Sequence, residues 1–478
     1  MVTRRDFFGG LLAGACFSGC RTREILEDRP VLSFGVISDL HITVAGSETA
    51  FRRALSYFRG REVDAVAVTG DLTDWGLRES LECVREAWRA EMSGTGIVPL
   101  MLTGNHDFEG WAYKDMTLDM HLHGRSEDDA LSRQGMKGTW SDVFAEDYSE
   151  FRVRTVNGYS FVSVEWQGES RGENETRAAE WLEAHRASLA TGRPFFFLRH
   201  QPFPDTVSSS VGRPGSRVLV EKLMTFPNAV AFTGHTHWTL TDERSIWQGG
   251  FTAVSVPSMS YTTIPYGYEN GSDLRTNETK MGMPRIPARA ELKEAQGFLV
   301  RVYPSCLVIE RHDFVVDRDI AAPWVVPLPQ KGNPHLWPFA FDIRARLSPV
   351  PAFPDACRVR TRTVNADMRN GRWGLLVALS FPAAHGCGGR VFDYEICVEG
   401  PGGESLAVKR YVSPSFHKDV SEEPSEQEFL FDGMALPETG RFRFAVVGRN
   451  CFGGRSAPIY SDWFSPCPGR EKSKYPLV

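Results

Sequence analysis

Five short segments that are rich in metal-binding side chains each follow an apolar run of the chain. They are Asp39-Leu40-His41, Gly70-Asp71, Gly104-Asn105-His106-Asp107, His200 and Gly234-His235-Thr236-His237. Together they supply three carboxylates, one carboxamide and five imidazoles. Two neighbouring divalent cations repel each other and need a bridging anion as well as further oxygen and nitrogen donors, which this set contains. The segments therefore indicate two adjacent metal ions with a proton donor beside them, a combination suited to cleaving phosphate esters.

Taken singly, these residues have ordinary explanations. A Gly-Asp pair or a lone asparagine is common in turns, and an isolated histidine such as His200 is usually packed or on the surface. The Gly-His-x-His segment is rarer. The metal-site prediction depends on the joint occurrence of all five segments, in order, each after a strand-like run.

The apolar runs have the length and composition of buried strands. Continuous Val, Ile, Leu and Phe are typical of strands covered on both faces, and the runs are Val31–Ser38, Val63–Thr69, Ile97–Thr103, Ser160–Glu165, Pro194–Arg199 and Ala229–Thr233. Because the carboxyl ends of such strands meet at one rim of a layered α/β fold, residues far apart in sequence become neighbours there. Asp71, at a tight turn after Gly70, is the natural bridging ligand.

Helices and further strands are predicted between and after these runs. Amphipathic spacing predicts helices at Glu48–Arg59, Leu77–Glu91 and Arg177–Leu189. A strand and a hairpin are predicted at Phe251–Val256, Gly297–Tyr303 and Cys306–Phe314. The alternation predicts an α/β layered domain. Two long irregular segments, 108–159 and 258–296, follow site segments, and we expect them to overhang the site.

The order D-x-H, G-D, G-N-H-D, H, G-H-x-H resembles that of the calcineurin-like metallophosphoesterases, over roughly residues 31–314. The resemblance implies a four-layer sandwich, in which two mixed sheets are flanked by helices. It implies a first metal held by Asp39, His41, Asp71 and His237. It implies a second metal held by Asp71, Asn105, His200 and His235. It also implies that His106 binds no metal and lies near the leaving-group oxygen, held by Asp107.

The expected chemistry follows from these residue types. Carboxylates and imidazoles suit Zn, Fe and Mn, and the donor set does not choose among them. Two such ions would polarise the phosphoryl oxygens and lower the pKa of a bridging water, so that hydroxide attacks in line. A charged His106 would stabilise the developing charge and protonate the departing alkoxide. Asp107 would favour the charged imidazole and fix its orientation.

Details of the motifs favour one branch of the family. Purple acid phosphatases have a tyrosine a few residues after the Gly-Asp pair and no histidine at the position of His41, whereas this chain lacks that tyrosine. The stretches 36–41 and 70–76 are similar to the class III cyclic-nucleotide phosphodiesterase and glycerophosphodiesterase branch, which usually has a second histidine where Arg199 stands. The favoured prediction is a phosphodiesterase. The alternatives are a phosphomonoesterase or nucleotidase on the same scaffold, and a non-catalytic surface-binding lipoprotein.

Residues 1–29 are interpreted as an export signal and tether. Arg4 and Arg5 precede a short uncharged apolar run that cannot span a bilayer, and the pair resembles a twin-arginine signal. The sequence Phe17-Ser18-Gly19-Cys20 resembles a bacterial lipobox, which would leave a lipid anchor on Cys20. We therefore expect an exported periplasmic or cell-envelope lipoprotein of a bacterium, acting on a small-molecule or polymeric phosphate ester.

The length and charge of the chain limit the alternatives. A chain of 478 residues is too long for one ordinary core, so two domains are expected. The net charge of −6 argues against a nucleic-acid-binding surface over the whole molecule. None of the nine cysteines forms a C-x-x-C pair, which argues against a thiolate zinc site. Those in the last quarter could form one or two disulfides in an exported protein.

The C-terminal part has a different pattern. The α/β domain is expected at 30–322, and the eight prolines of 323–354 predict an extended linker. Residues 355–478 contain short alternating runs without a helical stretch, which predicts a small all-β sandwich. The runs are Trp373–Ser380, Phe392–Val398, Ser405–Tyr411, Glu428–Phe431 and Arg441–Val447. The stretch 436–450 resembles the last hairpin of a fibronectin type III module, whose partner the sequence does not identify.

Overall fold

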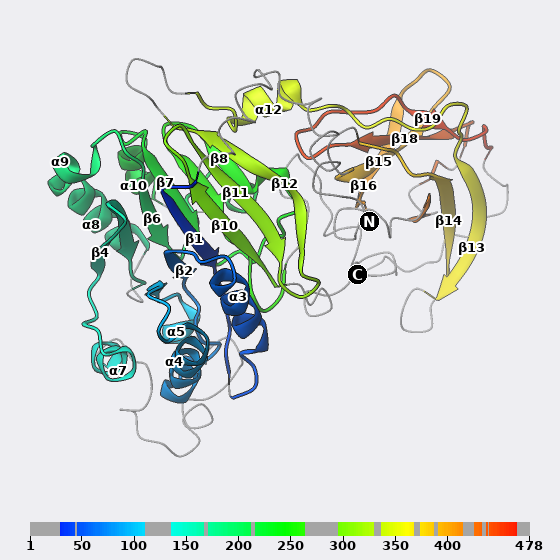
Figure 1. Ribbon diagram of the computed structural model, residues 1–478. Coiled ribbons are helices and arrows are strands. Elements are labelled where there is room, and N and C mark those ends of the chain that lie inside the picture. Colours follow the sequence, from blue (N-terminus) through cyan, green and yellow to red (C-terminus); the bar gives the residue numbers. More distant parts are fainter. Residues whose placement is uncertain are drawn as a thin grey trace.

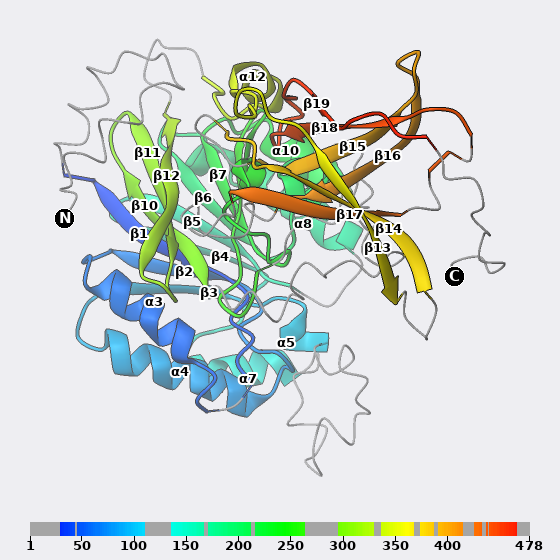
Figure 2. The same ribbon diagram turned by 90° about the vertical axis from the view of Figure 1, so that its right-hand side faces the viewer.

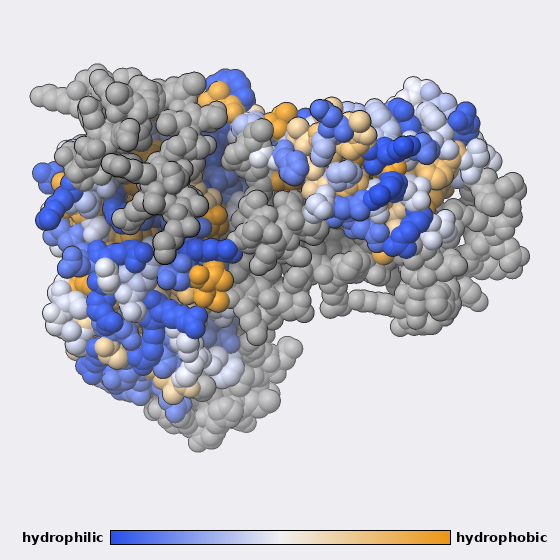
Figure 3. Space-filling model, turned by 45° about the vertical axis from the view of Figure 1, so that its right-hand side comes forward, coloured by the Kyte–Doolittle hydropathy of each residue, from blue (hydrophilic) through white to orange (hydrophobic). Residues whose placement is uncertain are grey.

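The computed structural model describes residues 29–43, 45–109, 135–166, 171–211, 216–262, 295–328, 336–367, 373–386, 391–413, 425–432, 436–437 and 439–465. They form an α/β domain followed by an all-β domain (Figure 1). The two domains are separate lobes, and hydrophilic side chains dominate the visible part of the α/β lobe (Figure 3). The predicted signal, with Arg4, Arg5 and Cys20, lies outside the described residues. Among the described residues, no helix is long and apolar enough to cross a membrane.

The first sheet of the α/β domain has six strands in the order β12-β11-β10-β1-β2-β3. The strands are β1 (Leu32–Ile37), β2 (Ala65–Thr69), β3 (Val98–Leu102), β10 (Gln296–Val302), β11 (Cys306–Asp313) and β12 (Arg318–Pro327). β1, β2 and β3 are parallel, whereas β10 runs antiparallel to β1. The outer face is covered by α3 (Thr49–Arg59), α4 (Arg78–Met92) and α7 (Gly135–Phe144), as Figure 2 shows.

The second sheet also has six strands, in the order β4-β5-β6-β7-β9-β8. They are β4 (Phe151–Val156), β5 (Tyr159–Val164), β6 (Phe195–Arg199), β7 (Ala229–Thr233), β8 (Ile246–Gln248) and β9 (Thr252–Ser255). β5, β6, β7 and β9 are parallel neighbours. The helices packed on its outer face are α8 (Arg171–Ala184), α9 (Arg186–Leu189) and α10 (Val218–Leu223).

The two sheets pack face to face around an aromatic core. The ring of Phe34 in β1 meets the rings of Phe161, Phe196 and Phe232 of the second sheet edge-on, with centroids 5.1, 4.6 and 6.0 Å away. Edge-to-face pairs of this kind add to the stability gained from burial alone. The predicted four-layer sandwich, with two mixed sheets between two layers of helices, is confirmed.

The C-terminal domain consists of two antiparallel sheets that share one core. Its strands are β13 (Arg360–Asp367), β14 (Trp373–Pro382), β15 (Asp393–Glu399), β16 (Ser405–Val412), β17 (Glu426–Asp432), β18 (Arg443–Arg449) and β19 (Ile459–Tyr460). The sheet orders are β13-β14-β17 and β16-β15-β18-β19. Leu379 and Phe431 of one sheet pack with Ile396 and Phe444 of the other. The predicted all-β sandwich is confirmed, and its fibronectin type III character stays a prediction.

The segment 323–354 contains more regular structure than expected. β12 continues to Pro327 in register with β11, so the expected domain boundary after residue 322 falls inside a strand. Helix α12 (Phe341–Leu347) forms later in the segment. The expectation of an extended linker is wrong at these two places. Proline is tolerated in β12 because this strand is at the edge of its sheet, where one side of the backbone needs no partner.

Two further expectations fall only partly on the described residues. Residues 110–134 and 263–294 of the long segments expected to overhang the site lie outside them. The cysteines that are described form no disulfide in the structure: Cys83, Cys306, Cys357, Cys397 and Cys451. Cys16, Cys20, Cys387 and Cys467 lie outside the described residues, so a disulfide that involves them stays a prediction.

Candidate dinuclear metal site

The predicted site residues meet where the carboxyl ends of strands from both sheets converge. They follow β1, β2 and β3 of the first sheet and β6 and β7 of the second. Six of the seven predicted metal ligands are buried, and His235 is half-buried; the buried ones are Asp39, His41, Asp71, Asn105, His200 and His237. The convergence expected from parallel strands therefore occurs here between two packed sheets.

One group of side chains comprises Asp39, His41, Asp71 and His237. One potential ligand atom from each of these residues lies within 4.8 Å of the others. Nε2 of His41 lies 3.0 Å from Nε2 of His237, which is itself 3.1 Å from Oδ1 of Asp39. Oδ2 of Asp71 lies 3.8 Å from Nε2 of His41. These four residues are the ones predicted to hold the first metal.

The second group contains Asp71, Asn105, His200 and His235. Nε2 of His200 lies 3.1 Å from Oδ2 of Asp71 and 3.0 Å from Oδ1 of Asn105. Nδ1 of His235 lies 2.8 Å from the same Asn105 oxygen. Because Asp71 belongs to both groups, its carboxylate has the position expected of a bridging ligand. The structure thus brings all seven predicted ligands together.

The donor set fits a pair of metal ions because its inward atoms are acceptors. His41 donates from Nδ1 to Oδ1 of Asp74 at 3.0 Å, His200 to the Thr69 carbonyl at 2.9 Å, and His237 to the Tyr261 carbonyl at 3.1 Å. A neutral imidazole that donates from Nδ1 presents a lone pair at Nε2. These Nε2 atoms face carboxylates, an amide oxygen or each other, an arrangement that a cation between them stabilises.

Backbone strain is concentrated in the same residues. Five of the seven predicted ligands have a positive φ: Asp39 (53°), His41 (47°), Asp71 (50°), His235 (72°) and His237 (54°). A non-glycine residue in this region costs on the order of 1–3 kcal/mol, and such residues cluster at functional sites. The strain turns the side chains toward a common centre at the expense of stability, which favours a functional role over a structural one.

Two glycines are required by the close approach of the site segments. Gly70 has a φ of 98°, and a Cβ there would collide with the ring of His200. A Cβ on Gly104 would lie 2.5 Å from the backbone nitrogen of Asp71 and 2.8 Å from Cδ2 of His200. Each glycine therefore lets a neighbouring strand end carry its ligand into the cluster.

Neighbouring imidazoles set the charge of the buried carboxylates. Burial alone would raise the pKa of Asp71, but the nearby His200 and His41 hold that pKa well below its usual range. Burial likewise opposes the lowering of the Asp39 pKa, which His237 causes by its charge and hydrogen bond. Burial lowers the pKa of His237. Ionised carboxylates and a neutral imidazole are the forms that bind metal ions.

His106 lies beside the two groups and contacts them through its backbone and ring. Its backbone N–H donates to Oδ1 of Asp71 at 2.8 Å. Its ring Nδ1 donates to the carbonyl of Asp74 at 3.1 Å and lies 3.5 Å from Oδ1 of the same residue. Partial burial opposes protonation, but Asp74 and Asp71 raise the pKa of His106 to about 9.

Asp107 does not contact the ring of His106, so the predicted role of Asp107 in holding that ring is wrong. Oδ1 of Asp107 accepts hydrogen bonds from the backbone and hydroxyl of Thr73, both at 2.8 Å. Oδ2 accepts from the backbone N–H groups of Gly104 at 2.8 Å and Leu72 at 3.2 Å. The fully buried carboxylate therefore ties the loops after β2 and β3 together. Consecutive residues in the helical turn α5 (His106–Glu109) point in different directions.

Asp74 is a candidate site residue that the sequence reasoning missed. It contacts the rings of both His41 and His106. The signal that could have found it is a second acid three residues after Asp71, in Gly70-Asp71-Leu72-Thr73-Asp74. Gln201 was also missed: it is buried, and its Nε2 donates to Oδ1 of Asn105 at 3.3 Å.

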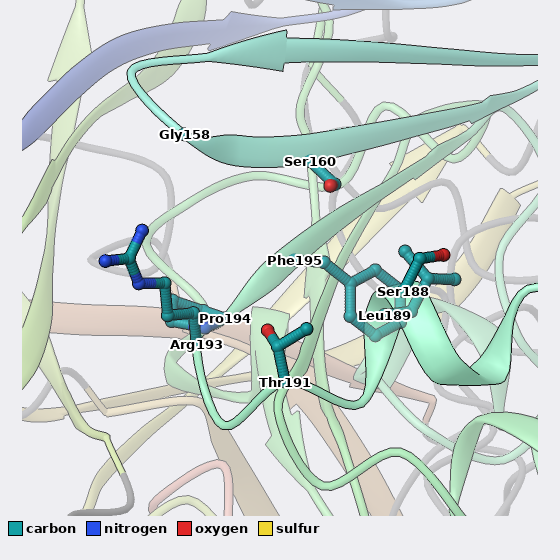
Figure 4. A pocket seen from close by; sticks show the side chains of 8 residues that line it. All are labelled: Gly158, Ser160, Ser188, Leu189, Thr191, Arg193, Pro194 and Phe195. Carbon is teal, nitrogen blue, oxygen red and sulfur yellow. The ribbon is translucent and has the colours of Figure 1, made fainter.

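Figure 4 shows a pocket of about 300 Å³ whose lining includes none of the predicted site residues. It is lined by the β4–β5 turn, by the start of β5, by α9, and by the residues that lead into β6, among them Ser160, Thr191 and Arg193. His200 follows the opposite end of β6, so the length of the strand separates this pocket from the ligand cluster. Its lining contains no carboxylate or imidazole, and it is not the candidate metal site.

Comparison with known proteins agrees with this site. Residues 32–239 match the family model described as calcineurin-like phosphoesterase, a stretch that contains all five site segments. This part of the chain is therefore similar to calcineurin-like metallophosphoesterase domains, and it contains the candidate metal site. No curated protein sequence matches the chain.

Solved structures similar to this chain cover 62–63% of it. A dimetal phosphatase from Danio rerio is 13% identical, with 63% of this chain and 100% of that chain covered and a TM-score of 0.38. GAP50, the anchor in the inner membrane complex of Plasmodium, is 13% identical over 63% and 90%, with a TM-score of 0.37. A purple acid phosphatase from yellow lupin (Lupinus luteus) seeds is 12% identical over 62% and 53%, with a TM-score of 0.38.

Proposed function

We propose that the protein is an exported metal-dependent phosphoric ester hydrolase that prefers phosphodiesters. The observation that carries the proposal is the pair of ligand groups that share Asp71, with His106 beside them. In this proposal one metal is held by Asp39, His41, Asp71 and His237. The other is held by Asp71, Asn105, His200 and His235. Zn, Fe and Mn are the candidates because these ligands are imidazoles and oxygens.

In the proposed reaction the residues around the metal ions have separate roles. When bound, two metal ions supply Lewis acidity and an activated water near neutral pH. Asp71 holds its carboxylate toward both groups, and its other oxygen fixes the backbone of His106. Because Asp74 engages Nδ1 of His106, Nε2 is the ring nitrogen that carries the proton for the departing alkoxide. Asp107 keeps the two loops that carry Asp71 and His106 in register.

The diester preference is supported by the sequence around the site. No tyrosine follows Gly70-Asp71 within the turn, and His41 belongs to the first ligand group. Both features are those of the phosphodiesterase branch that the motifs resemble. A periplasmic or extracellular diester is the substrate class that agrees with export through the twin-arginine signal and anchoring at Cys20.

Parallel assays test the proposal. The full chain, supplied with Mn, Zn or Fe, would be assayed with bis-p-nitrophenyl phosphate and with p-nitrophenyl phosphate. We expect faster turnover of the diester. Faster turnover of the monoester would instead indicate a phosphomonoesterase. No hydrolysis of either ester at full metal occupancy would indicate a non-catalytic binding protein. Cell fractionation with a Cys20→Ala variant tests the anchor, because the variant should leave the membrane fraction.

A further inference from the structure

The chain runs from His237 directly into a loop whose buried polar side chains hold one another. Trp238 donates from Nε1 to Oδ2 of Asp242 at 2.9 Å. Arg244 donates to the same carboxylate from Nη2 at 2.7 Å, from Nε at 3.0 Å and from its backbone N–H at 2.9 Å. A buried bidentate pair with this many hydrogen bonds fixes both position and orientation. We call residues 234–245 the site loop.

Glu243 anchors the far end of the site loop from two directions. Its carboxylate accepts hydrogen bonds from Nη1 of Arg311 in β11 at 2.7 Å and Nε1 of Trp324 in β12 at 2.9 Å. Nη2 of Arg344, in α12, donates to it at 2.8 Å, and Nη1 of Arg344 donates to the Glu243 carbonyl. The site loop is therefore held both by its own domain and by the helix that leads to the C-terminal sandwich.

The sandwich contacts the same loop and helix through a small apolar cluster. We call Phe392, Val412, Cys451 and Phe452 the docking cluster; it is separate from the main core of the sandwich. The guanidinium of Arg244 lies 4.7 Å from the ring centroid of Phe392, and that of Arg344 lies 4.7 Å from the ring centroid of Phe452. The rings of Phe341 and Phe452 are 5.9 Å apart. Figure 1 shows α12 between the two lobes.

The site loop needs such anchors because two of its residues are strained. His235 and His237 have φ angles of 72° and 54°. Strained residues keep their conformation only where the surroundings constrain them. At the near end, the N–H of His235 donates to the carboxylate of Asp39 at 3.0 and 3.1 Å. At the far end, the constraint comes from Asp242 and Glu243, whose partners include residues of α12 and, through Arg244, the sandwich.

We propose that the C-terminal sandwich, docked through α12 and the docking cluster, braces the site loop and so keeps His235 and His237 in place to bind metal. The proposal rests on the metal site of the proposed function. It gives the sandwich a task within this chain: without the docking contacts, the site loop opens more often and the site releases metal faster.

Two variants of the full chain break the brace at different points. Arg344→Met removes the contacts with Glu243 but keeps the aliphatic stem, and Phe452→Ala removes the aromatic contact outside the main sandwich core. Arg346→Met is the matched control, because Arg346 lies in the same helix and is exposed. The readouts are amide hydrogen exchange of residues 234–245 and the rate at which a chelator removes Zn from the loaded protein.

We expect both brace variants to exchange roughly tenfold faster in the site loop and to lose Zn several-fold faster, while the control matches the parent chain. Parent-like exchange and Zn loss in both variants would overturn the proposal. The two proposals can fail separately. If the parent chain binds Zn but hydrolyses no phosphate ester, the proposed function is wrong. If the variants still exchange faster in that case, the proposal that the sandwich holds the site loop is retained. If Phe452→Ala fails to fold, Arg344→Met decides alone.

Discussion

The ring of His106 is held by Asp74: its Nδ1 lies 3.1 Å from the Asp74 carbonyl oxygen and 3.5 Å from Oδ1 of the carboxylate. The same Oδ1 accepts a hydrogen bond from Nδ1 of His41 at 3.0 Å. One acidic residue thus orients a proposed metal ligand and the proposed proton donor together. The two functions are therefore coupled at Asp74, and a change of His106 itself is needed to separate them.

The His106→Ala variant should keep its metal and lose turnover. The ring of His106 belongs to neither predicted ligand group, so we expect unchanged metal content by elemental analysis. Turnover of diesters with poor leaving groups should fall by about 10²-fold or more, because the departing alkoxide loses its proton donor, and bis-p-nitrophenyl phosphate should be less affected. An equal loss for good and poor leaving groups would remove His106 from the role of acid. His185→Ala, an exposed histidine beside Trp181, is the control.

The Asp74→Asn variant should act through His106. The amide replaces the negative charge that faces the ring, so we expect a lower kcat for poor leaving groups with little change in KM. In the double variant with His106→Ala, the two losses should add only in part, because His106, one of the two imidazole partners of Asp74, is already absent. Additive losses in the double-mutant cycle would indicate that Asp74 acts through His41 alone.

The Asp107→Asn variant should damage stability more than chemistry. The carboxylate accepts four hydrogen bonds, and an amide nitrogen would face donors from Gly104 and Leu72. We expect a loss of about 1–3 kcal/mol in the free energy of unfolding, measured by urea denaturation. The fraction that remains folded should keep the leaving-group dependence of the parent chain. A parent-like stability combined with the kinetic defect of His106→Ala would restore the role that the sequence suggested for Asp107.

Lowering the pH should weaken the ion pairs by which Glu243 holds the site loop to Arg311 and Arg344. Burial opposes ionisation, but Arg311 and Arg344 lower the pKa of Glu243 from 4.5 to about 2. Because the unfolded chain takes up this proton near pH 4.5 and the folded chain only near pH 2, the stabilisation is complete above pH 4.5 and disappears as the pH falls toward 2. It amounts to at most about 3 kcal/mol, since the side chain remains 23% exposed.

Urea midpoints of the parent chain and Glu243→Gln, measured between pH 7 and pH 2, check this prediction. The difference between the urea midpoints of the two proteins should be constant above pH 4.5 and become smaller below it. Both proteins contain the site carboxylates, so titration of those groups does not affect the difference between the two urea midpoints. A difference that does not change with pH would show that the charge of Glu243 contributes nothing.

Much of the fold could be predicted because buried strands leave a clear sequence pattern. The predicted run at 229–233 coincides with β7, and Val31–Ser38 contains β1. β4 was missed because it is an edge strand with two arginines and no continuous apolar run. Helix α12 was missed because it is short and prolines surround it, and because the contacts of Arg344 with Glu243 are far apart in sequence.

The clustering of the predicted ligands follows from strand ends, whereas the predictions that failed depended on side-chain directions within turns. Residues such as His200 and Asp71 come directly after strands, and the convergence of strand ends places them without knowledge of the loops. The choice between Asp74 and Asp107 as the partner of His106 depends on side-chain directions within two turns, which sequence spacing does not determine. The docking of the sandwich depends on contacts between Arg244 and Phe392, which no local pattern reveals.

Metal titration of activity tests the central claim most directly. Chelator-treated protein would receive increasing amounts of Zn or Mn, and hydrolysis of bis-p-nitrophenyl phosphate would be followed together with bound metal. We predict that activity reaches its plateau at about two bound ions per chain, and that Asp71→Asn, which weakens the shared ligand, neither binds two ions nor hydrolyses the ester. Full activity in protein that holds no metal, or no activity in protein that holds two ions, would contradict the account.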